Sequence, residues 1–418
     1  MPTAKTNNYR FIGWGLLLII LISGFFIARY ENLNLFFLSV LLSEIVLVII
    51  YSRRFNESQI AIVRIILGCL FVYSGIVKGI DPVGTQYRIM DYFIVFETDW
   101  AVPLALPLSV VMNAAEFILG ILLVFNVNMK ITSWLVMLMM AVFTVVTIND
   151  AIYNPVPNCG CFGDALIISN WQTFYKNLII DSLILIVFLS RNRTGRWFKA
   201  KAEWAILLIF FLIFTGFEIY NIRHLPVIDF RQWKIGNTMA NKNPLPLKYY
   251  LSYRNKETGE VKEYLSPDYP YNDSVWNATW EFIRQRVVDP NPVIHDLKIE
   301  DENGNDFTPD IIENPDYQFI LVAYDLSLTN LSKINEIKDF ISKCNTNGIS
   351  FAILTSSIPD DVRQFKETYG IDAEFYYADD VSLMIMIRSN PGLLLLKEAV
   401  VIDKWHYNDF PTFGEVFK

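Results

Sequence analysis

The first half of the chain consists mainly of long apolar runs separated by short polar segments. Runs of about 17–25 residues are long enough to cross the hydrocarbon core of a bilayer, and only helices satisfy their backbone groups in lipid. Seven runs have a suitable length, at residues 11–28, 35–51, 60–78, 104–125, 131–149, 173–190 and 203–221. The pattern therefore predicts a multi-pass α-helical membrane bundle with about seven spans.

Beyond residue 222 the apolar runs become short. Residues 247–265 alternate apolar and polar positions on both sides of a Thr-Gly turn, which predicts a β-hairpin, and residues 275–287 have the spacing of a short amphipathic helix. From residue 291 strands and helices alternate, which predicts a compact α/β domain. The expected strands are 293–299, 318–324, 349–355, 392–397 and 399–404, and the expected helices are 331–344 and 359–368.

Charge separates the same two halves. The chain has a net charge of −8, but residues 1–222 carry 15 Lys/Arg against 13 Asp/Glu, while residues 223–418 carry 20 against 30. A nearly neutral apolar half is thus followed by an acidic polar half. This balance argues against nucleic acid as a partner.

Basic residues predict the orientation of the bundle, because cytoplasmic loops are enriched in Lys and Arg. They gather in alternate connecting segments: Lys5, Arg10, Arg53, Arg54, Lys130, Arg191, Arg193, Arg196, Lys199 and Lys201. We therefore expect the amino terminus in the cytoplasm of a bacterium, and both the loop at 150–172 and the carboxy-terminal half on the outer, periplasmic face of its inner membrane. The first span could instead be a signal sequence, but the small-residue cleavage site is poor.

Charged residues inside the predicted spans are costly and usually face the bundle interior or a partner. Arg64 and Glu116 fall on neighbouring antiparallel spans and could pair, either as a structural ion pair or as part of a proton or quinone site. Asn113 and Asp181 could join either network.

The segment "NPVPNCGCFGDAL" at 154–166 holds two of the four cysteines, Cys159 and Cys161. A disulfide between residues i and i+2 closes a small strained ring that is easily reduced, which suits redox exchange on an oxidising face of the membrane. A metal clip and an inert turn are the alternatives. A zinc site normally needs four Cys or His ligands, and the histidines are far away in the sequence, at 224, 295 and 406. Asp164 could act as a local acid or base, or cap a helix.

Three stretches resemble the DoxX/MauE family of small membrane proteins: "SGIVKGIDPVGT" at 74–85, "NAAEFILGILLVF" at 113–125 and "NCGCFGD" at 158–164. The resemblance covers residues 60–190, and the C-x-C-F-G element is similar to the MauE branch. Members of that branch are implicated in disulfide formation in an exported methylamine dehydrogenase subunit. The resemblance implies that Cys159 and Cys161 form the redox pair and that Glu116 is the family's acidic position. It does not carry the substrate over.

Residues 291–418 resemble a thioredoxin-like domain, with "HDLKIEDENGNDFTPDII" as its opening strand and turn and "YQFILVAYDLSLTN" as its first central strand. By this resemblance Pro391 is the family's cis-proline, and Asn390 and Pro391 lie where the family binds extended polypeptide. The position of the family's C-x-x-C motif reads Asp325 to Asn330 and has no cysteine. Cys344 lies in the next predicted helix, where we expect a buried apolar residue. This domain is therefore not expected to exchange thiols by itself.

The expected fold is a membrane bundle of about seven spans with an exported α/β thioredoxin-like domain. Its parts are two amino-terminal spans (1–59), the DoxX/MauE-like core (60–190), a basic loop with the last span (191–222), an exported hairpin and helix (223–290) and the thioredoxin-like domain (291–418).

The predicted function is membrane thiol–disulfide redox chemistry on exported proteins, with electrons passing to a membrane quinone or a periplasmic thioredoxin. The alternatives are a non-enzymatic membrane scaffold and a DoxX-type subunit of a respiratory complex. We expect no bound metal.

Overall fold

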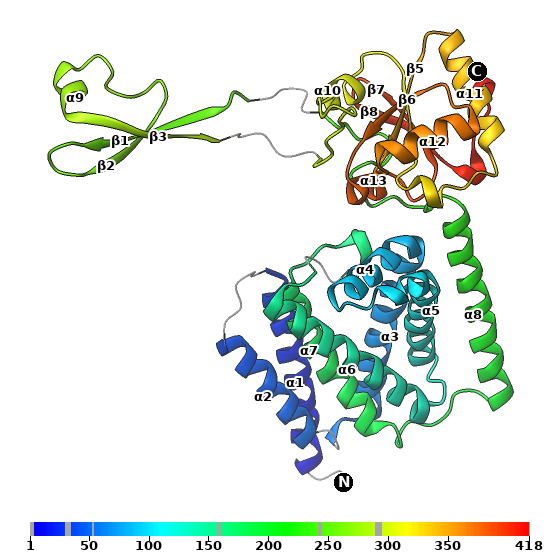
Figure 1. Ribbon diagram of the computed structural model, residues 1–418. Helices are drawn as coiled ribbons and strands as arrows, with labels where there is room; N and C mark the ends of the chain where they lie inside the picture. The colour runs from blue at the N-terminus through cyan, green and yellow to red at the C-terminus, as the bar shows by residue number, and fades with distance from the viewer. Residues whose placement is uncertain are drawn as a thin grey trace. The chain divides into compact units, whose positions relative to one another are not determined.

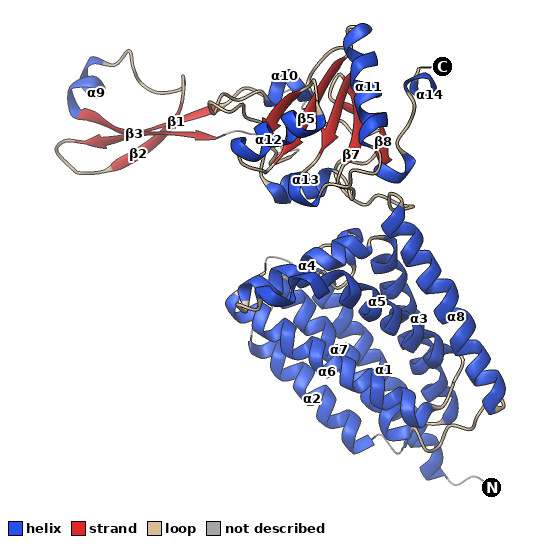
Figure 2. Cartoon of the chain, turned by 45° about the vertical axis from the view of Figure 1, so that its right-hand side comes forward, coloured by secondary structure: helices blue, strands red, loops and turns tan. Residues whose placement is uncertain are grey.

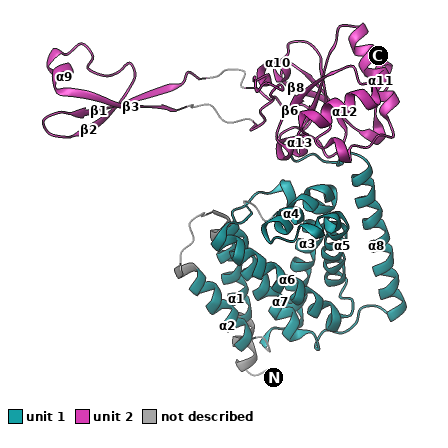
Figure 3. Ribbon diagram, in the orientation of Figure 1, with its two compact units in different colours: residues 1–231 teal, residues 232–418 magenta. Residues whose placement is uncertain are grey.

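The computed structural model of the 418-residue chain describes residues 4–29, 35–51, 54–156, 160–240, 245–288 and 295–417. The chain forms two compact units, residues 1–231 and 232–418 (Figure 3). The first unit is helical, and the second contains both β-sheets of the described chain (Figures 1 and 2).

Unit 1 is a bundle of long helices joined by short connections. Its helices are α1 (Ala4–Arg29), α2 (Leu35–Tyr51), α3 (Glu57–Ile80), α4 (Pro82–Val95), α5 (Ala105–Val124), α6 (Met129–Tyr153), α7 (Asn170–Ser190) and α8 (Ala200–Arg223). Two 3-10 turns, η2 (Asp99–Leu104) and η3 (Gly163–Ala165), precede α5 and α7.

Five described helices are long and apolar enough to cross a membrane: Glu57–Ile80, Asp99–Val124, Met129–Tyr153, Asn170–Ser190 and Ala200–Arg223. Each of them overlaps a predicted span. Helices α1 and α2 coincide with the other two predicted spans, but their apolar described parts, Gly13–Phe25 and Leu38–Tyr51, are shorter. The membrane character of this half is therefore clear, and the count of seven spans stays a prediction.

Helices α3 and α5 form the closest packed pair of the bundle, because glycines lie where their backbones meet. A Cβ atom on Gly120 would lie 2.6 Å from the backbone nitrogen of Val72, and one on Gly75 would lie 2.8 Å from Cα of Phe117. Small residues allow this approach in membrane helices, where close packing replaces the hydrophobic driving force. The end of this pair that contains Ser74 and Lys78 supports the candidate site.

Helix α4 was not predicted, because its 14 residues are too few to span a membrane and were interpreted as part of a loop. Its start follows local rules: Asp81 accepts a hydrogen bond from the Gly84 backbone N–H at 2.8 Å, and Pro82 occupies the first turn. Lys78 therefore lies in the last turns of α3, and Arg88 lies in α4.

Unit 2 contains a five-stranded sheet with the order β6-β5-β4-β7-β8. Its strands are β4 (Gln318–Val322), β5 (Ser350–Thr355), β6 (Glu374–Tyr377), β7 (Gly392–Lys397) and β8 (Val400–His406). Strands β5 and β6 run parallel to the fully buried central strand β4, while β7 lies antiparallel to β4 and pairs with β8. Figure 2 shows helices on both faces of this sheet.

The helices of this α/β domain are α10 (Thr308–Ile312), α11 (Ile334–Thr346), α12 (Pro359–Tyr369), α13 (Asp380–Met386) and α14 (Phe413–Val416). Helices α11 and α12 and strands β4, β5, β7 and β8 confirm the sequence predictions within a few residues. The predicted strand at 293–299 is wrong for its described part, since residues 295–299 form no strand. Residues 291–294 lie outside the described residues.

A second sheet of unit 2 has three strands in the order β2-β1-β3. Strands β1 (Lys248–Asn255) and β2 (Val261–Leu265) confirm the predicted hairpin. The helix predicted at 275–287 is wrong: α9 (Ser274–Thr279) ends after one and a half turns, and β3 (Trp280–Val288) pairs with the other edge of β1. Residues with high strand propensity, such as Phe282 and Val287, pair with that edge, which local periodicity alone does not reveal.

Candidate functional site

The CGC loop (residues 154–166) is attached to α3 beside the second cysteine of the pair. The backbone carbonyl of Cys161 accepts a hydrogen bond from the Ser74 hydroxyl at 2.9 Å. Gly160 and Gly163 have positive φ angles of 65° and 53°, and the Gly163 N–H donates to the Gly160 carbonyl at 2.9 Å. Glycine adopts this left-handed backbone without strain, so the two glycines permit the tight turn around Cys161.

Cys159, the other half of the predicted redox pair, lies outside the described residues. Cys161 is half-buried and lines a cavity of unit 1. The structure therefore places one of the two predicted redox residues. The pairing of Cys159 with Cys161 stays a prediction.

Contacts of Phe162 and Asn170 also hold the loop between α3 and α7. The buried Phe162 ring lies 6.0 Å from the Tyr73 ring and 4.6 Å from the Lys176 ammonium nitrogen. The Asn170 amide donates to the Val156 carbonyl at 2.9 Å and to the Asn154 side-chain oxygen at 2.8 Å. The loop is thus fixed on both sides of the pair.

Glu116, the predicted acidic position, forms an ion pair with Lys78. The Lys78 Nζ atom lies 2.6 Å from Glu116 Oε2, and both side chains are buried. The Asn113 amide donates to the Lys78 carbonyl at 3.4 Å, so the pair lies in a polar cluster between α3 and α5. Lys78 also lines the cavity beside Cys161, so Glu116 contacts a residue of the cavity wall without lining the cavity itself.

The predicted pairing of Arg64 with Glu116 is wrong. The Arg64 guanidinium donates to the Leu123 carbonyl and, at 2.9 Å, to the Val124 carbonyl, and it lies 4.5 Å from the Trp197 ring. These carbonyls end helix α5, where a cation satisfies acceptors that have no partner within the helix. Arg64 also precedes Ser74 by ten residues on α3, a separation of about 15 Å along the helix. It is therefore a packing residue at the other end of α3 and does not support the CGC loop.

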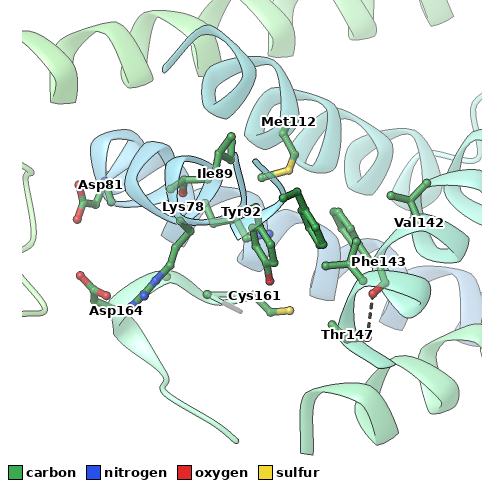
Figure 4. A pocket seen from close by; sticks show the side chains of 17 residues that line it. Lys78, Asp81, Ile89, Tyr92, Met112, Val142, Phe143, Thr147, Cys161 and Asp164 are labelled. Carbon is green, nitrogen blue, oxygen red and sulfur yellow. Dashed lines mark hydrogen bonds between the residues drawn. The ribbon is translucent and has the colours of Figure 1, made fainter. Parts of the chain in front are cut away.

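Asp164 lies inside the short turn η3 and does not cap a helix. The following helix, α7, is capped by Ser169, whose hydroxyl accepts a hydrogen bond from the Gln172 N–H at 3.2 Å. The interpretation of Asp164 as a helix cap is therefore wrong. Its side chain lines the same cavity as Cys161 (Figure 4), so a role as a local acid or base stays a prediction.

The cavity beside Cys161 has a volume of about 280 Å³ and is enclosed by α3, α4, α5, α6 and the CGC loop (Figure 4). Charged and polar side chains form one part of its wall, and apolar side chains form the rest. The polar group comprises Lys78, Asp81, Thr85, Arg88, Tyr92, Thr147 and Asp164. The apolar group comprises Ile89, Phe96, Met112, Val142, Phe143 and Val146.

Tyr92 connects this cavity to a buried carboxyl group. Its hydroxyl lies 2.5 Å from Asp150 Oδ2, and the Asp150 side chain is fully buried. Thr147, one turn before Asp150 on α6, accepts a hydrogen bond from the Asn177 amide at 3.1 Å. The sequence interpretation missed Arg88 and Tyr92 because it missed α4, although the Asp81-Pro82 helix start could have revealed that helix.

The loop from Asp325 to Asn330 in unit 2 is joined to Asn390 by two hydrogen bonds. The Asn390 amide donates to the Asp325 carbonyl at 2.8 Å, and the Asn330 N–H donates to the Asn390 carbonyl at 2.9 Å. The Asn390-Pro391 peptide is cis, as the resemblance implied. Polypeptide binding at Asn390 and Pro391 stays a prediction.

Cys344 lies in the core of the α/β domain, as predicted. Its side chain is fully buried on α11, and burial raises the pKa of its thiol to about 12. A thiol that ionises only at such a high pH is inert in exchange. Among the described residues, no group of three or more His, Cys, Asp or Glu side chains could hold a metal ion.

The match of this chain to a known family lies within the helical unit. Residues 56–191, close to the predicted core at 60–190, match the family described as "Methylamine utilisation protein MauE". No curated protein and no solved structure matches the chain, so the thioredoxin-like resemblance of unit 2 stays a prediction. The match spans helices α3 to α7 and the loop between α6 and α7, so this part of the membrane protein is MauE-like.

Proposed function

We propose that this protein is a membrane thiol–disulfide redox protein that acts on exported proteins through Cys159 and Cys161. The observation that carries the proposal is the position of Cys161. It lies in a glycine turn that is fixed to α3, and it lines a cavity that also contains Lys78 and Arg88. The thiolate is the reactive form of cysteine, and Cys161 is half-buried beside these polar side chains, whereas Cys344 is enclosed in an apolar core.

The chemistry is an exchange of two electrons. A thiolate of the exported protein attacks the Cys159–Cys161 disulfide, forms a mixed disulfide with one of the two cysteines and releases the other as a thiolate. A second thiolate of the exported protein then displaces the bound cysteine, so the exported protein gains a disulfide and the pair becomes a dithiol. The two sulfurs thus alternate between dithiol and disulfide. The acceptor of the electrons is either a membrane quinone or a periplasmic thioredoxin.

The proposed location follows from the basic residues of the connecting segments. We place the amino terminus in the cytoplasm and the CGC loop and unit 2 on the periplasmic face of a bacterial inner membrane. The alternation of Lys- and Arg-rich segments along the chain supports this orientation. Only that face lets disulfides persist.

Unit 2 is proposed to bind the exported partner and not to perform chemistry. The segment Asp325–Asn330 contains no cysteine, and Cys344 is fully buried. A thioredoxin-like surface around Pro391 would hold extended polypeptide while the CGC pair exchanges disulfides with it. The unit adds binding specificity to the redox pair of the membrane half.

Exchange with glutathione tests this proposal on the purified chain in lipid nanodiscs. We expect the CGC pair to interconvert between dithiol and disulfide across mixtures of reduced and oxidised glutathione, read as a two-proton mass change in the peptide that contains it. A chain with Cys161→Ser should instead accumulate a glutathione adduct on Cys159. A pair that stays in one state across all mixtures contradicts the proposal.

A static scaffold is the second candidate function, and the Asp325–Asn330 loop favours it, because this loop offers no thiol to a partner. In that case the CGC pair is a permanent staple. Replacing Cys159 and Cys161 with serine separates the two functions in cells. Loss of function at a normal protein level supports redox chemistry, and retained function supports the scaffold.

A further inference from the structure

The cavity beside Cys161 extends far into the apolar part of unit 1. Its inner wall contains Met112 of α5 and Val142 and Val146 of α6. Val142 lies 11 residues before the end of α6 at Tyr153, about 16 Å along the helix axis. The inner wall is therefore at the depth of the hydrocarbon core, and in the view of Figure 4 Cys161 lies between Val142 and the side chains of Asp81 and Asp164. A ligand that fills this space must be soluble in lipid.

The cavity also meets the outer surface of the bundle. Phe96, which follows α4, and Val142 of α6 both line it, and their side chains are 55% and 54% exposed. The neighbouring Ile94 and Val95 at the end of α4 are exposed apolar residues as well. This surface between α4 and α6 is suited to contact with lipid, so a lipid-soluble molecule can enter from the membrane.

Polar groups lie in one part of the wall of the same cavity. Tyr92 offers a hydroxyl that is hydrogen-bonded to the buried Asp150 carboxyl, and Lys78 and Arg88 line the cavity together with the carboxylates of Asp81 and Asp164. An apolar space with a hydroxyl and charged hydrogen-bonding groups in one part of its wall fits a ring with oxygen substituents. Its volume of about 280 Å³ is near the lower end of ligand pockets, which span about 300–1,000 Å³, so it suits a headgroup with its tail in lipid.

We propose that this cavity binds the headgroup of a lipid-soluble quinone, which accepts the electrons of the CGC pair. The inference rests on the proposed function, since it identifies the acceptor for that chemistry. As the S–S bond of Cys159 and Cys161 forms, the two thiols lose two electrons and two protons. The quinone gains both and leaves as the quinol. Tyr92, backed by Asp150, is the group that moves a proton at a quinone oxygen.

The test uses the full chain in lipid nanodiscs, reduced with dithiothreitol, freed of the reductant and kept without oxygen. Decylubiquinone is then added, and quinol formation and thiol loss are followed together. We expect one quinol per chain and the loss of two thiols. A variant with Cys159→Ser and Cys161→Ser should form none. Wild-type chain that forms no more quinol than this variant overturns the inference.

Two matched substitutions on α6 locate the reaction in the cavity. Val142→Trp fills the cavity from its exposed side and should slow quinol formation at least about tenfold. Val145→Trp places the same side chain on the same helix, at a residue that is 68% exposed and does not line the cavity, and should change the rate less than about twofold. Equal rates in both variants contradict a quinone site in this cavity.

Tyr92→Phe tests the proton step. It should lower the rate of quinol formation about tenfold and change its dependence on pH, because proton transfer by a positioned side chain contributes at least that much. Tyr87→Phe on the same helix is the control, since Tyr87 does not line the cavity. A Tyr92→Phe chain with the wild-type rate and pH profile contradicts the role of Tyr92.

Oxidised glutathione, added to a second sample of the reduced chain, separates the two proposals. Oxidation by glutathione but not by decylubiquinone overturns the quinone site and leaves the thiol–disulfide function intact. A pair that neither reagent oxidises overturns both.

Discussion

Lys78 and Glu116 form a buried ion pair at the wall of the candidate site. The two charges lie 2.6 Å apart with almost no exposure to solvent, so each depends on the other for compensation. Lys78→Met leaves the Glu116 carboxylate buried without this cation. We expect this variant to lose about 3–5 kcal/mol of stability, measured as a lower thermal midpoint in detergent.

The matched control is the chain with both Lys78→Met and Glu116→Gln, which removes both charges. It should recover more than half of the lost stability, because no uncompensated charge remains. If Lys78→Met alone is as stable as the wild-type chain, the ion pair does not hold α3 to α5.

Cys344 provides a second prediction at the scale of one residue. Its thiol has a pKa raised by burial to about 12, against about 8.5–9 for a free cysteine, so it stays protonated in the folded domain. We expect no alkylation of Cys344 by iodoacetamide at pH 8 in the native chain and complete alkylation after unfolding in guanidinium. Because the unfolded thiol ionises first, the free energy of unfolding should also fall as the pH rises above about 9. Fast native alkylation contradicts its place in the core.

The sequence identified Cys161, Glu116 and Asp164 as residues of one site. It gave Glu116 the wrong ion-pair partner, and it made Asp164 a helix cap, a position that Ser169 holds. Arg64 was a reasonable partner for Glu116 because both are charged residues on neighbouring spans. Lys78 was missed as the partner because it is the last residue of the predicted span at 60–78, while α3 continues to Ile80. Pairing in a bundle depends on the relative height and rotation of helices, which the length of an apolar run does not specify.

At the scale of helices, the contact between α3 and α5 depends on glycine. Gly120→Ala places a methyl group 2.6 Å from the backbone nitrogen of Val72, so the two helices must separate. We expect a loss of about 1–3 kcal/mol, as for other overpacked positions, seen as a lower thermal midpoint in detergent.

Gly216→Ala on α8 is the matched control, because a Cβ atom there meets nothing within 4 Å. Alanine is the better helix former, so this variant should be at least as stable as the wild-type chain. A Gly120→Ala chain of wild-type stability contradicts the close packing of α3 and α5.

Whether a helix or strand could be predicted from the sequence depended on its length and on the element that it packs or pairs with. Long apolar helices and the buried strands β4, β5 and β7 were evident from hydrophobic runs. Helix α4 and strand β3 were not, for different reasons. Helix α4 is short and half-buried, and its start is specified by Asp81 and Pro82, while β3 is a strand because β1 offers it an edge. The cavity therefore escaped the sequence interpretation, since α4 forms one of its walls.

At the scale of the whole molecule, residues 245–288 form a sheet of their own within unit 2. The chain on either side of it is held by the α/β domain: Met239 donates its N–H to the Ala399 carbonyl at 2.7 Å, and the Trp233 and His295 rings lie 5.5 Å apart. Replacing residues 241–294 with a flexible linker of about eight residues, which spans about 27 Å when extended, should leave this domain folded. Cys344 in the shortened full chain should resist iodoacetamide as in the wild type. Native alkylation of Cys344 in that chain would show that the domain needs the inserted sheet.

The central claim for the whole protein is that the CGC pair alternates between dithiol and disulfide on the outer face of the membrane. The direct measurement is maleimide trapping in intact cells of a chain with Cys69→Ala and Cys344→Ala, so that only Cys159 and Cys161 remain of the four cysteines. We predict that the pair is oxidised at steady state, gains two labels after brief treatment with reductant and becomes oxidised again within minutes of its removal. A pair that keeps one redox state throughout, or that is labelled only after the membrane is broken, contradicts the account.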